Sequence, residues 1–204
     1  MKYPNVIWEG RYQPIHRSHV AYVRTLLDHA EHVWIFVVEN ERSADVVADP
    51  DSLPVPEFTR EVDLHHGPEK NPLPFWLRYR LVGETLADEL PGAPITVWGG
   101  RRLDLDWPLY AKTFPPERVF ITPKRDSFED AKAAAWEKLG EQVVRIEVDH
   151  LPPVSATEIR DRIREGGRID DLLCSTTIRI LRESGYLDRL AGREEAPPAA
   201  ASQG

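Results

Sequence analysis

Ten residues near the N-terminus combine glycine, proline and two histidines in an order typical of a phosphate-binding turn. The segment Gly10-Arg11-Tyr12-Gln13-Pro14-Ile15-His16-Arg17-Ser18-His19 follows a short apolar run, Val6-Ile7-Trp8. Apolar residues then recur every three or four positions, which predicts an amphipathic helix: Val20, Val23, Leu26, Leu27 and Ala30. A turn between a strand and a helix offers free backbone N–H groups and the positive end of the helix dipole to an anion. His16 and His19 are three positions apart, so both rings can reach one ligand.

A second segment with phosphate-binding side chains lies near the C-terminal third, at residues 153–160. Ser155 and Thr157 offer hydroxyl groups, and the guanidinium of Arg160 matches phosphate oxygens. The pair Ser155 and Glu158 also has the spacing of a helix capping box, which is a purely structural alternative. Neither segment contains an evident nucleophile. Together they suit a polyphosphate site at which direct in-line transfer takes place, with the protein positioning the phosphates and stabilising the leaving group.

The elements that must position these residues alternate along the chain between strands and helices. Short apolar runs predict strands at residues 6–8, 33–38, 95–98, 119–122 and 143–148. Helical spacing predicts helices at residues 17–31, 75–90, 127–139, 156–164 and 175–183, and a loop with a short helix at 103–114. This alternation predicts an α/β fold with a five-stranded parallel sheet covered on both faces. Such sheets bind ligands beyond the carboxyl ends of their strands.

The chain divides into three parts on this pattern. Residues 1–150 form the predicted nucleotide-binding core, residues 151–190 a C-terminal helical segment that carries the second motif, and residues 191–204 a disordered tail rich in Ala, Pro and Glu. Residues 39–74 show no sustained periodicity and many Pro, Asp and Glu residues. Long irregular loops of this kind often serve as lids or binding loops.

Composition excludes several classes of function. The formal net charge of -8 over 204 residues argues against a nucleic-acid partner, which requires a basic face. No apolar run approaches membrane-spanning length, and the N-terminus lacks the features of a signal peptide. A single cysteine, Cys174, cannot form an internal disulfide, which fits a reducing cytoplasm. We therefore expect a cytoplasmic protein with small-molecule partners; a homo-oligomer is compatible with the sequence.

The two motifs resemble the two signatures of the nucleotidylyltransferase superfamily. The first is usually written His-x-Gly-His and corresponds to residues 16–19, and the second is Ile-Ser-x-Thr-x-Ile-Arg and corresponds to residues 154–160. The Gly-Arg-Tyr-Gln-Pro start of the first motif and the segment Asn71-Pro72 with Arg78 are similar to the archaeal-type nicotinamide mononucleotide adenylyltransferases. This resemblance covers residues 6–190, although residues 39–68 match poorly.

The resemblance implies a Rossmann-like, doubly wound domain that joins a nucleoside triphosphate, CTP or ATP, to a small phosphorylated acceptor. The reaction would need Mg²⁺. It would release pyrophosphate, because an acceptor oxygen would attack the α-phosphorus directly. His16 and His19 would hold the triphosphate and stabilise the transition state, and Arg160 would hold the β- and γ-phosphates. The remaining nucleotide-binding residues implied by the two motifs are Gly10, Arg11, Tyr12, Gln13, Ser155 and Thr157.

Departures from the family pattern concern the surfaces that select substrates. Ser18 occupies the usual glycine position of the first signature. Residues 39–41 replace a Gly-Ser-rich loop, and residues 123–126 replace the common Gly-Asn-Pro. Some relatives attach CMP to phosphonates in natural-product pathways, and cationic side chains at the predicted ligand edge would suit such an acceptor: Arg78, Arg101, Arg102, Lys124 and Arg125. We therefore favour CTP-dependent phosphonate activation slightly over nicotinamide mononucleotide adenylylation in NAD synthesis.

Three alternatives stay open at this point. Ser18 motivates a non-catalytic nucleotide-sensing module that kept the fold and lost turnover. A metal-dependent hydrolase could use His16 and His19 with His65-His66 or His150, although no third ligand has motif-like spacing. Both histidines could also be structural. A class I aminoacyl-tRNA synthetase shares a similar first motif, but this chain is too short and too acidic for one.

Overall fold

The computed structural model of the chain describes residues 2–39, 70–103 and 107–193. Its centre is one sheet of five parallel strands in the order β3-β2-β1-β4-β5. The strands are β1 (Tyr3–Gly10), β2 (Ala30–Glu39), β3 (Ile95–Arg101), β4 (Val119–Lys124) and β5 (Val143–Glu147). The predicted α/β class, the number of strands and their parallel direction are confirmed. Most of the irregular segment 39–74, and residues 194–204 of the predicted tail, lie outside the described residues.

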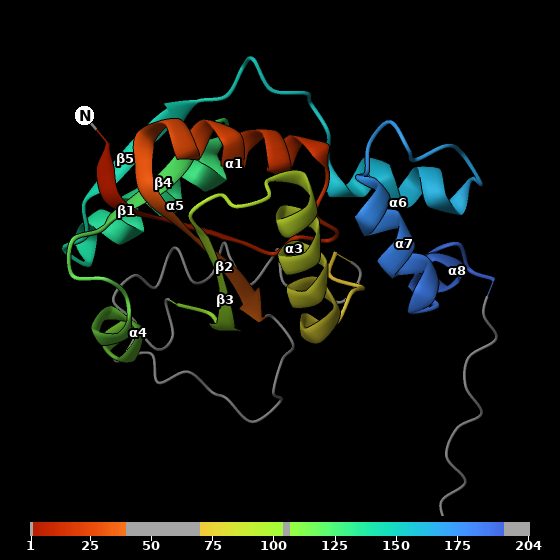
Figure 1. Cartoon of the computed structure of the whole chain (residues 1–204), viewed down its shortest axis with the longest axis horizontal. Helices are drawn as coiled ribbons and strands as arrows, with labels where there is room; N and C mark the ends of the chain where they lie inside the picture. The colour runs from red at the N-terminus through yellow and green to blue at the C-terminus, as the bar shows by residue number, and fades with distance from the viewer. Residues whose placement is uncertain (1, 40–69, 104–106, 194–204) are drawn as a thin grey trace, which may run out of the picture.

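Helices cover both faces of the sheet (Figure 1). The strand residues Val6, Val33 and Ile35 belong to a core shared with α1 (Arg17–His29) and α3 (Phe75–Glu89). The strand residues next to these in sequence, such as Ile7 and Phe36, belong to a second core with α4 (Trp107–Thr113) and α5 (Ser127–Lys138). Neighbouring residues of a strand point to opposite faces, so the two cores lie on opposite sides of the sheet. None of the described helices combines the length and the hydropathy that crossing a membrane requires.

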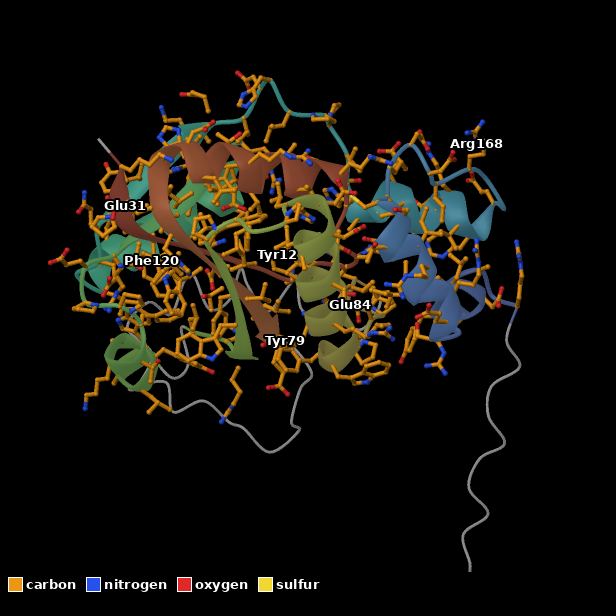
Figure 2. All side chains as sticks on the ribbon, in the orientation of Figure 1. Tyr12, Glu31, Tyr79, Glu84, Phe120 and Arg168 are labelled. Atoms are coloured by element: carbon orange, nitrogen blue, oxygen red, sulfur yellow. The ribbon has the colours of Figure 1, made fainter. Side chains whose placement is uncertain are left out.

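The C-terminal helical segment packs against the first of these cores. It consists of α6 (Ala156–Arg164), α7 (Ser175–Glu183) and α8 (Tyr186–Leu190), which lie beside α3 and the start of α1 (Figure 1). A buried hydrogen bond of 2.9 Å joins the hydroxyls of Thr85 on α3 and Thr177 on α7. Glu84, which also lies on α3 (Figure 2), accepts a hydrogen bond of 2.9 Å from Arg179 on α7. The segment therefore shares a core with the sheet.

The strand predicted at residues 95–98 is too short, because β3 continues through Gly99 and Gly100 to Arg101. Both glycines pair with the end of β2. A Cβ atom on Gly99 would lie 2.9 Å from the ring of Phe75, and one on Gly100 would lie 2.5 Å from the hydroxyl of Tyr110. The two glycines thus let aromatic rings from both faces approach the strand.

Smaller differences concern the ends of elements. The strands β1 and β2 begin three residues earlier than their apolar runs. β4 continues through Pro123, and the short helix α8 was not predicted. The predicted bounds of α6 and α7 are confirmed to the residue.

Candidate active site

The cavity that holds the candidate site opens between the two strands at which the order of strands across the sheet reverses. β1 and β4 are neighbours, but the chain continues from β1 to β2 on one side and from β4 to β5 on the other. The carboxyl ends of such a strand pair diverge and leave a crevice for a ligand. A cavity of about 950 Å³ lies there, between the turn after β1, the start of α5 and the start of α6.

The turn after β1 is shaped around the ring of Tyr12. Tyr12 has a φ of 51°, in the left-handed region, and its buried ring lies over Gly10. A Cβ atom on Gly10 would lie 2.8 Å from this ring. The glycine at position 10 therefore makes room for Tyr12, and both residues line the cavity, as do Arg11, Gln13 and Ser18.

The two histidines of the first motif form a stacked pair at the start of α1. Their ring centroids are 3.6 Å apart with an interplanar angle of 23°, and the rings of Trp8 and Tyr12 lie against His19. His16 is the N-cap residue of α1, and neither imidazole Nδ1 has a hydrogen-bond partner in the described part of the chain. Both side chains line the cavity.

Burial keeps both imidazoles neutral. Burial and then the cationic Arg125 lower the pKa of His16 to about 3. Burial, His16 and Arg125 hold the pKa of His19 well below its ordinary value. A neutral imidazole has one N–H donor and one acceptor nitrogen, so each ring can offer a single hydrogen bond to a phosphate oxygen.

The second motif meets the first in the same cavity. Ser155 caps α6 by accepting a hydrogen bond of 3.1 Å from the backbone N–H of Glu158, as its spacing predicted. The buried guanidinium of Arg160 donates from Nη1 to the carbonyl of Gln13 at 3.1 Å and from Nη2 to Thr157 Oγ1 at 3.3 Å. Residues 147 positions apart are thus joined directly, and Ser155, Thr157 and Arg160 all line the cavity.

Arg78 is not in the cavity wall, contrary to the acceptor-binding role predicted for it. Its side chain is fully buried, and its guanidinium donates to three backbone carbonyls. Nε donates to Leu73 at 3.0 Å, and Nη1 donates to Arg11 at 2.8 Å and to Val38 at 2.7 Å. Gln13 forms two further hydrogen bonds with the backbone of Leu73, at 3.2 and 3.0 Å. These two side chains fix the ends of β1 and β2 beside the segment before α3.

The other predicted acceptor residues divide into two groups. Arg102 and Arg125 line the cavity. Arg101 and Lys124 do not, and Lys124 forms an exposed ion pair of 2.6 Å with Glu147. Lys70 lines the cavity and was not predicted.

The wall that α5 contributes also contains charged residues that lie outside the two sequence motifs. Glu129 and Lys132 lie on α5 and Glu9 lies at the end of β1, and all three line the cavity. Glu129 and Lys132 are three positions apart, so one helix face carries both. That spacing is common on solvated helices, and only the fold shows that this face is buried against β1.

Within the described residues, no group of three His, Cys, Asp or Glu side chains could hold a metal ion. His150 is exposed and does not line the cavity, whereas His65 and His66 lie outside the described residues. The metal-dependent hydrolase therefore has no ligand set in this part of the chain.

The fold and the two motifs at this cavity resemble those of the nucleotidylyltransferases. No protein-family model matches the chain. Among curated proteins it is similar to the phosphonoformate cytidylyltransferase of Streptomyces viridochromogenes, with 29% identity over 191 residues, which cover 89% of this chain and 92% of that protein.

Solved structures of nucleotidylyltransferases share the fold. One, from Vibrio parahaemolyticus, is described as a nicotinate-nucleotide adenylyltransferase; its TM-score is 0.59 at 16% identity, over 96% of this chain and 98% of that one. A bifunctional NMN adenylyltransferase/ADP ribose pyrophosphatase from Francisella tularensis has a TM-score of 0.57 at 13% identity, over 93% of this chain and 52% of that one. The nicotinic acid mononucleotide adenylyltransferase of Plasmodium falciparum has a TM-score of 0.53 at 12% identity, over 91% and 98%. The resemblance predicted from the two motifs is confirmed.

Proposed function

We propose that this protein transfers CMP from CTP to a small phosphonate and releases pyrophosphate. The observation that carries the proposal is the meeting of both motifs in one cavity, with Arg160 bonded to the turn that precedes His16. The choice of CTP and a phosphonate is supported by the similarity to a phosphonoformate cytidylyltransferase and by the cationic residues Arg102 and Lys70 in the cavity wall.

The proposed transfer needs positioning more than acid–base chemistry. An ionised oxygen of the acceptor forms a bond to the α-phosphorus, the bond between this phosphorus and the bridging oxygen breaks, and pyrophosphate leaves with the electron pair. Arg160 and the N-terminus of α6 would hold the β- and γ-phosphates, because they offer a guanidinium and free backbone N–H groups. His16 and His19 would donate hydrogen bonds to the phosphate oxygens on which charge accumulates.

The Mg²⁺ that such reactions use would enter this cavity bound to the triphosphate. The described residues offer no three-ligand site, and the cavity carboxylates Glu9 and Glu129 both lie within 3.6 Å of the Lys132 ammonium. Bound to the phosphates, Mg²⁺ would neutralise part of their charge.

Pyrophosphate release tests this proposal. Purified protein is incubated with Mg²⁺ and each of CTP, ATP, UTP and GTP, in combination with phosphonoformate, nicotinamide mononucleotide or nicotinic acid mononucleotide. We expect release with CTP and phosphonoformate. Release with ATP and a mononucleotide instead would replace the proposed substrates by those of NAD synthesis. Triphosphate binding without release from any pair would support the nucleotide-sensing module.

A further inference from the structure

A buried charged cluster lies where α5 packs against the end of β1. The Lys132 ammonium donates a hydrogen bond of 3.1 Å to the carbonyl of Glu9. It also lies 3.6 Å from Glu9 Oε1 and 3.6 Å from Glu129 Oε2. The three side chains are only 7, 11 and 8% exposed, in the order Lys132, Glu9, Glu129. Two carboxylates therefore share one ammonium at the cavity wall.

One carboxylate oxygen of this cluster lacks a hydrogen-bond donor. Glu129 Oε2 has no hydrogen-bond partner among the described residues, and its distance of 3.6 Å from the Lys132 ammonium is that of an ion pair, too long for a hydrogen bond. The other oxygen, Oε1, lies 3.5 Å from the guanidinium of Arg125. A buried acceptor without a donor is costly, and such groups often mark a place where a ligand completes the bonding.

The unsatisfied atoms of the described residues concentrate at this cavity. In the part of the chain that the structure describes, eight buried side-chain polar atoms have no hydrogen-bond partner. Six of them belong to residues that line the cavity: Tyr12, His16, His19, Tyr22, Glu129 and Trp136. The donor that Glu129 lacks is therefore to be sought in a molecule that occupies this cavity.

Charge decides which part of the substrates meets Glu129. The triphosphate and a phosphonate are both anionic, so a carboxylate repels them, whereas Arg11, Lys70 and Arg102 in the same cavity attract them. The base and the ribose are the uncharged parts of the triphosphate, and of these the base is the planar one. Apolar surfaces that suit a planar ring also line the cavity, at Phe128, Leu151 and Pro152.

We propose that Glu129 selects the base of the triphosphate by accepting a hydrogen bond at Oε2 from its exocyclic amino group. Cytosine and adenine carry an amino group at the corresponding ring position, whereas uracil and guanine carry an oxygen there that the carboxylate repels. Carboxylates recognise the amino group of cytosine in nucleic acids in the same way. This inference rests on the proposed function and adds the residue that excludes UTP and GTP.

Substitution of Glu129 by glutamine tests the inference against a matched control. The Glu129→Gln side chain can turn an amide NH₂ toward the oxygen of uracil. We expect the wild-type protein to prefer CTP over UTP in kcat/KM, and Glu129→Gln to lower this preference by roughly 10- to 100-fold. Glu9→Gln removes the other carboxylate beside Lys132, so it is expected to change both rates alike and to leave the ratio within about twofold.

The inference is overturned if the preference survives in Glu129→Gln, or if Glu9→Gln changes it equally. Isothermal titration calorimetry measures the preference for CTP over UTP in binding, without turnover. If no acceptor gives product, the proposed function is refuted, but the role of Glu129 in base selection can still be tested by binding. A second test changes the nucleotide instead of the protein. The triphosphate of 2-pyrimidinone riboside, which lacks the amino group, should bind to the wild-type protein more weakly than CTP. Equal binding of this analogue, or a loss seen only with 2′-deoxy-CTP, would also overturn the inference.

Discussion

At the scale of single residues, the candidate site contains two neutral histidines, although a charged pair would attract phosphates more strongly. The stacked rings of His16 and His19 are 3.6 Å apart between centroids, and two imidazolium ions at that distance would repel each other. Burial adds to this cost by disfavouring the charged form of each ring. In the proposed function the pair would therefore act through oriented N–H donors, while Arg160 would supply the positive charge.

This neutral pair predicts acid sensitivity of the fold. In the unfolded chain His16 and His19 titrate near their ordinary pKa of 6.5, whereas the pKa of folded His16 is about 3. Between these values the unfolded state binds more protons, so the free energy of unfolding falls as the pH falls below about 6.5. Each histidine contributes about 1.4 kcal/mol per pH unit in this window. Urea unfolding between about pH 7 and about pH 5 measures the slope above most carboxylate titration.

Matched histidine variants isolate the contribution of the pair. His16→Asn combined with His19→Asn should flatten the slope, because the asparagine side chain does not titrate. His150→Asn alters an exposed histidine and should leave it unchanged. A double variant with the wild-type slope would show that other groups cause the acid sensitivity.

Arg160 is expected to act through the geometry of its guanidinium as well as through its charge. Nη1 and Nη2 are held by Gln13 and Thr157, which fixes the direction of the remaining N–H groups. Arg160→Lys keeps the charge and loses this fork, so we expect the KM for the triphosphate to rise roughly tenfold or more. Arg164→Lys changes an exposed arginine on the same helix, and its KM for the triphosphate should stay within about twofold of the wild-type value. An Arg160→Lys enzyme with unchanged KM would contradict the assigned role.

At the scale of elements, the buried guanidinium of Arg78 determines how β1, β2 and α3 meet at the cavity edge. Arg78→Met fills a similar volume but leaves the carbonyls of Arg11 and Val38 without this donor, whereas the carbonyl of Leu73 keeps its hydrogen bond from Gln13. Buried polar groups left unsatisfied cost about 1–3 kcal/mol each, so we expect the free energy of unfolding to fall by roughly 3 kcal/mol or more. Denaturant unfolding measures this loss.

A neighbouring arginine of α3 provides the control for that experiment. Arg80 forms ion pairs with Glu84 and Glu183, and its side chain is 38% exposed. Exposed pairs contribute little, so Arg80→Met should lower the free energy of unfolding far less than Arg78→Met does. Equal losses in the two variants would mean that the three carbonyl contacts of Arg78 do not stabilise the fold.

Local signals explain which elements the sequence predicted well. The bounds of α6 follow from the Ser155 cap and from Gly166, which ends the helix with a φ of 70°. The predicted strand ends at residue 98, three residues before β3 does, because a Gly-Gly pair such as Gly99-Gly100 usually indicates a turn. Here the glycines accommodate rings from α3 and α4, and packing between elements distant in the chain leaves no local sequence signal.

The same distinction applies to the candidate site. His16, His19 and Arg160, which the structure brings together in the cavity, are predictable from the sequence because each lies in a short motif. The positions of Arg78, Glu129 and Lys132 depend on which carbonyl or carboxylate the folded chain places beside them. An isolated arginine or an i, i+3 ion pair does not distinguish a solvated surface from a buried wall.

At the scale of the whole molecule, the cavity joins segments from opposite ends of the chain. The turn before α1 and the start of α6 each supply part of the proposed phosphate-binding groups, and the helical segment 151–190 reaches the sheet through a shared core. The net charge of -8 opposes the approach of an anionic substrate. Affinity must therefore arise from local cations and N–H donors within the cavity.

A triphosphate that bridges these two segments should protect both from exchange at once. A ligand that binds only the folded protein stabilises it by RT ln(1 + [L]/Kd), about 2.7 kcal/mol at a hundredfold excess over Kd. We expect CTP with Mg²⁺ to raise the unfolding temperature and to slow amide hydrogen exchange at residues 10–19 and 155–160 together. Helix α4 contributes no residue to the cavity wall and should gain protection only from the global increase in stability. In Arg160→Ala both local effects should weaken together, because either segment alone holds only part of the phosphate chain. Protection confined to one segment would mean that the nucleotide does not span the two motifs.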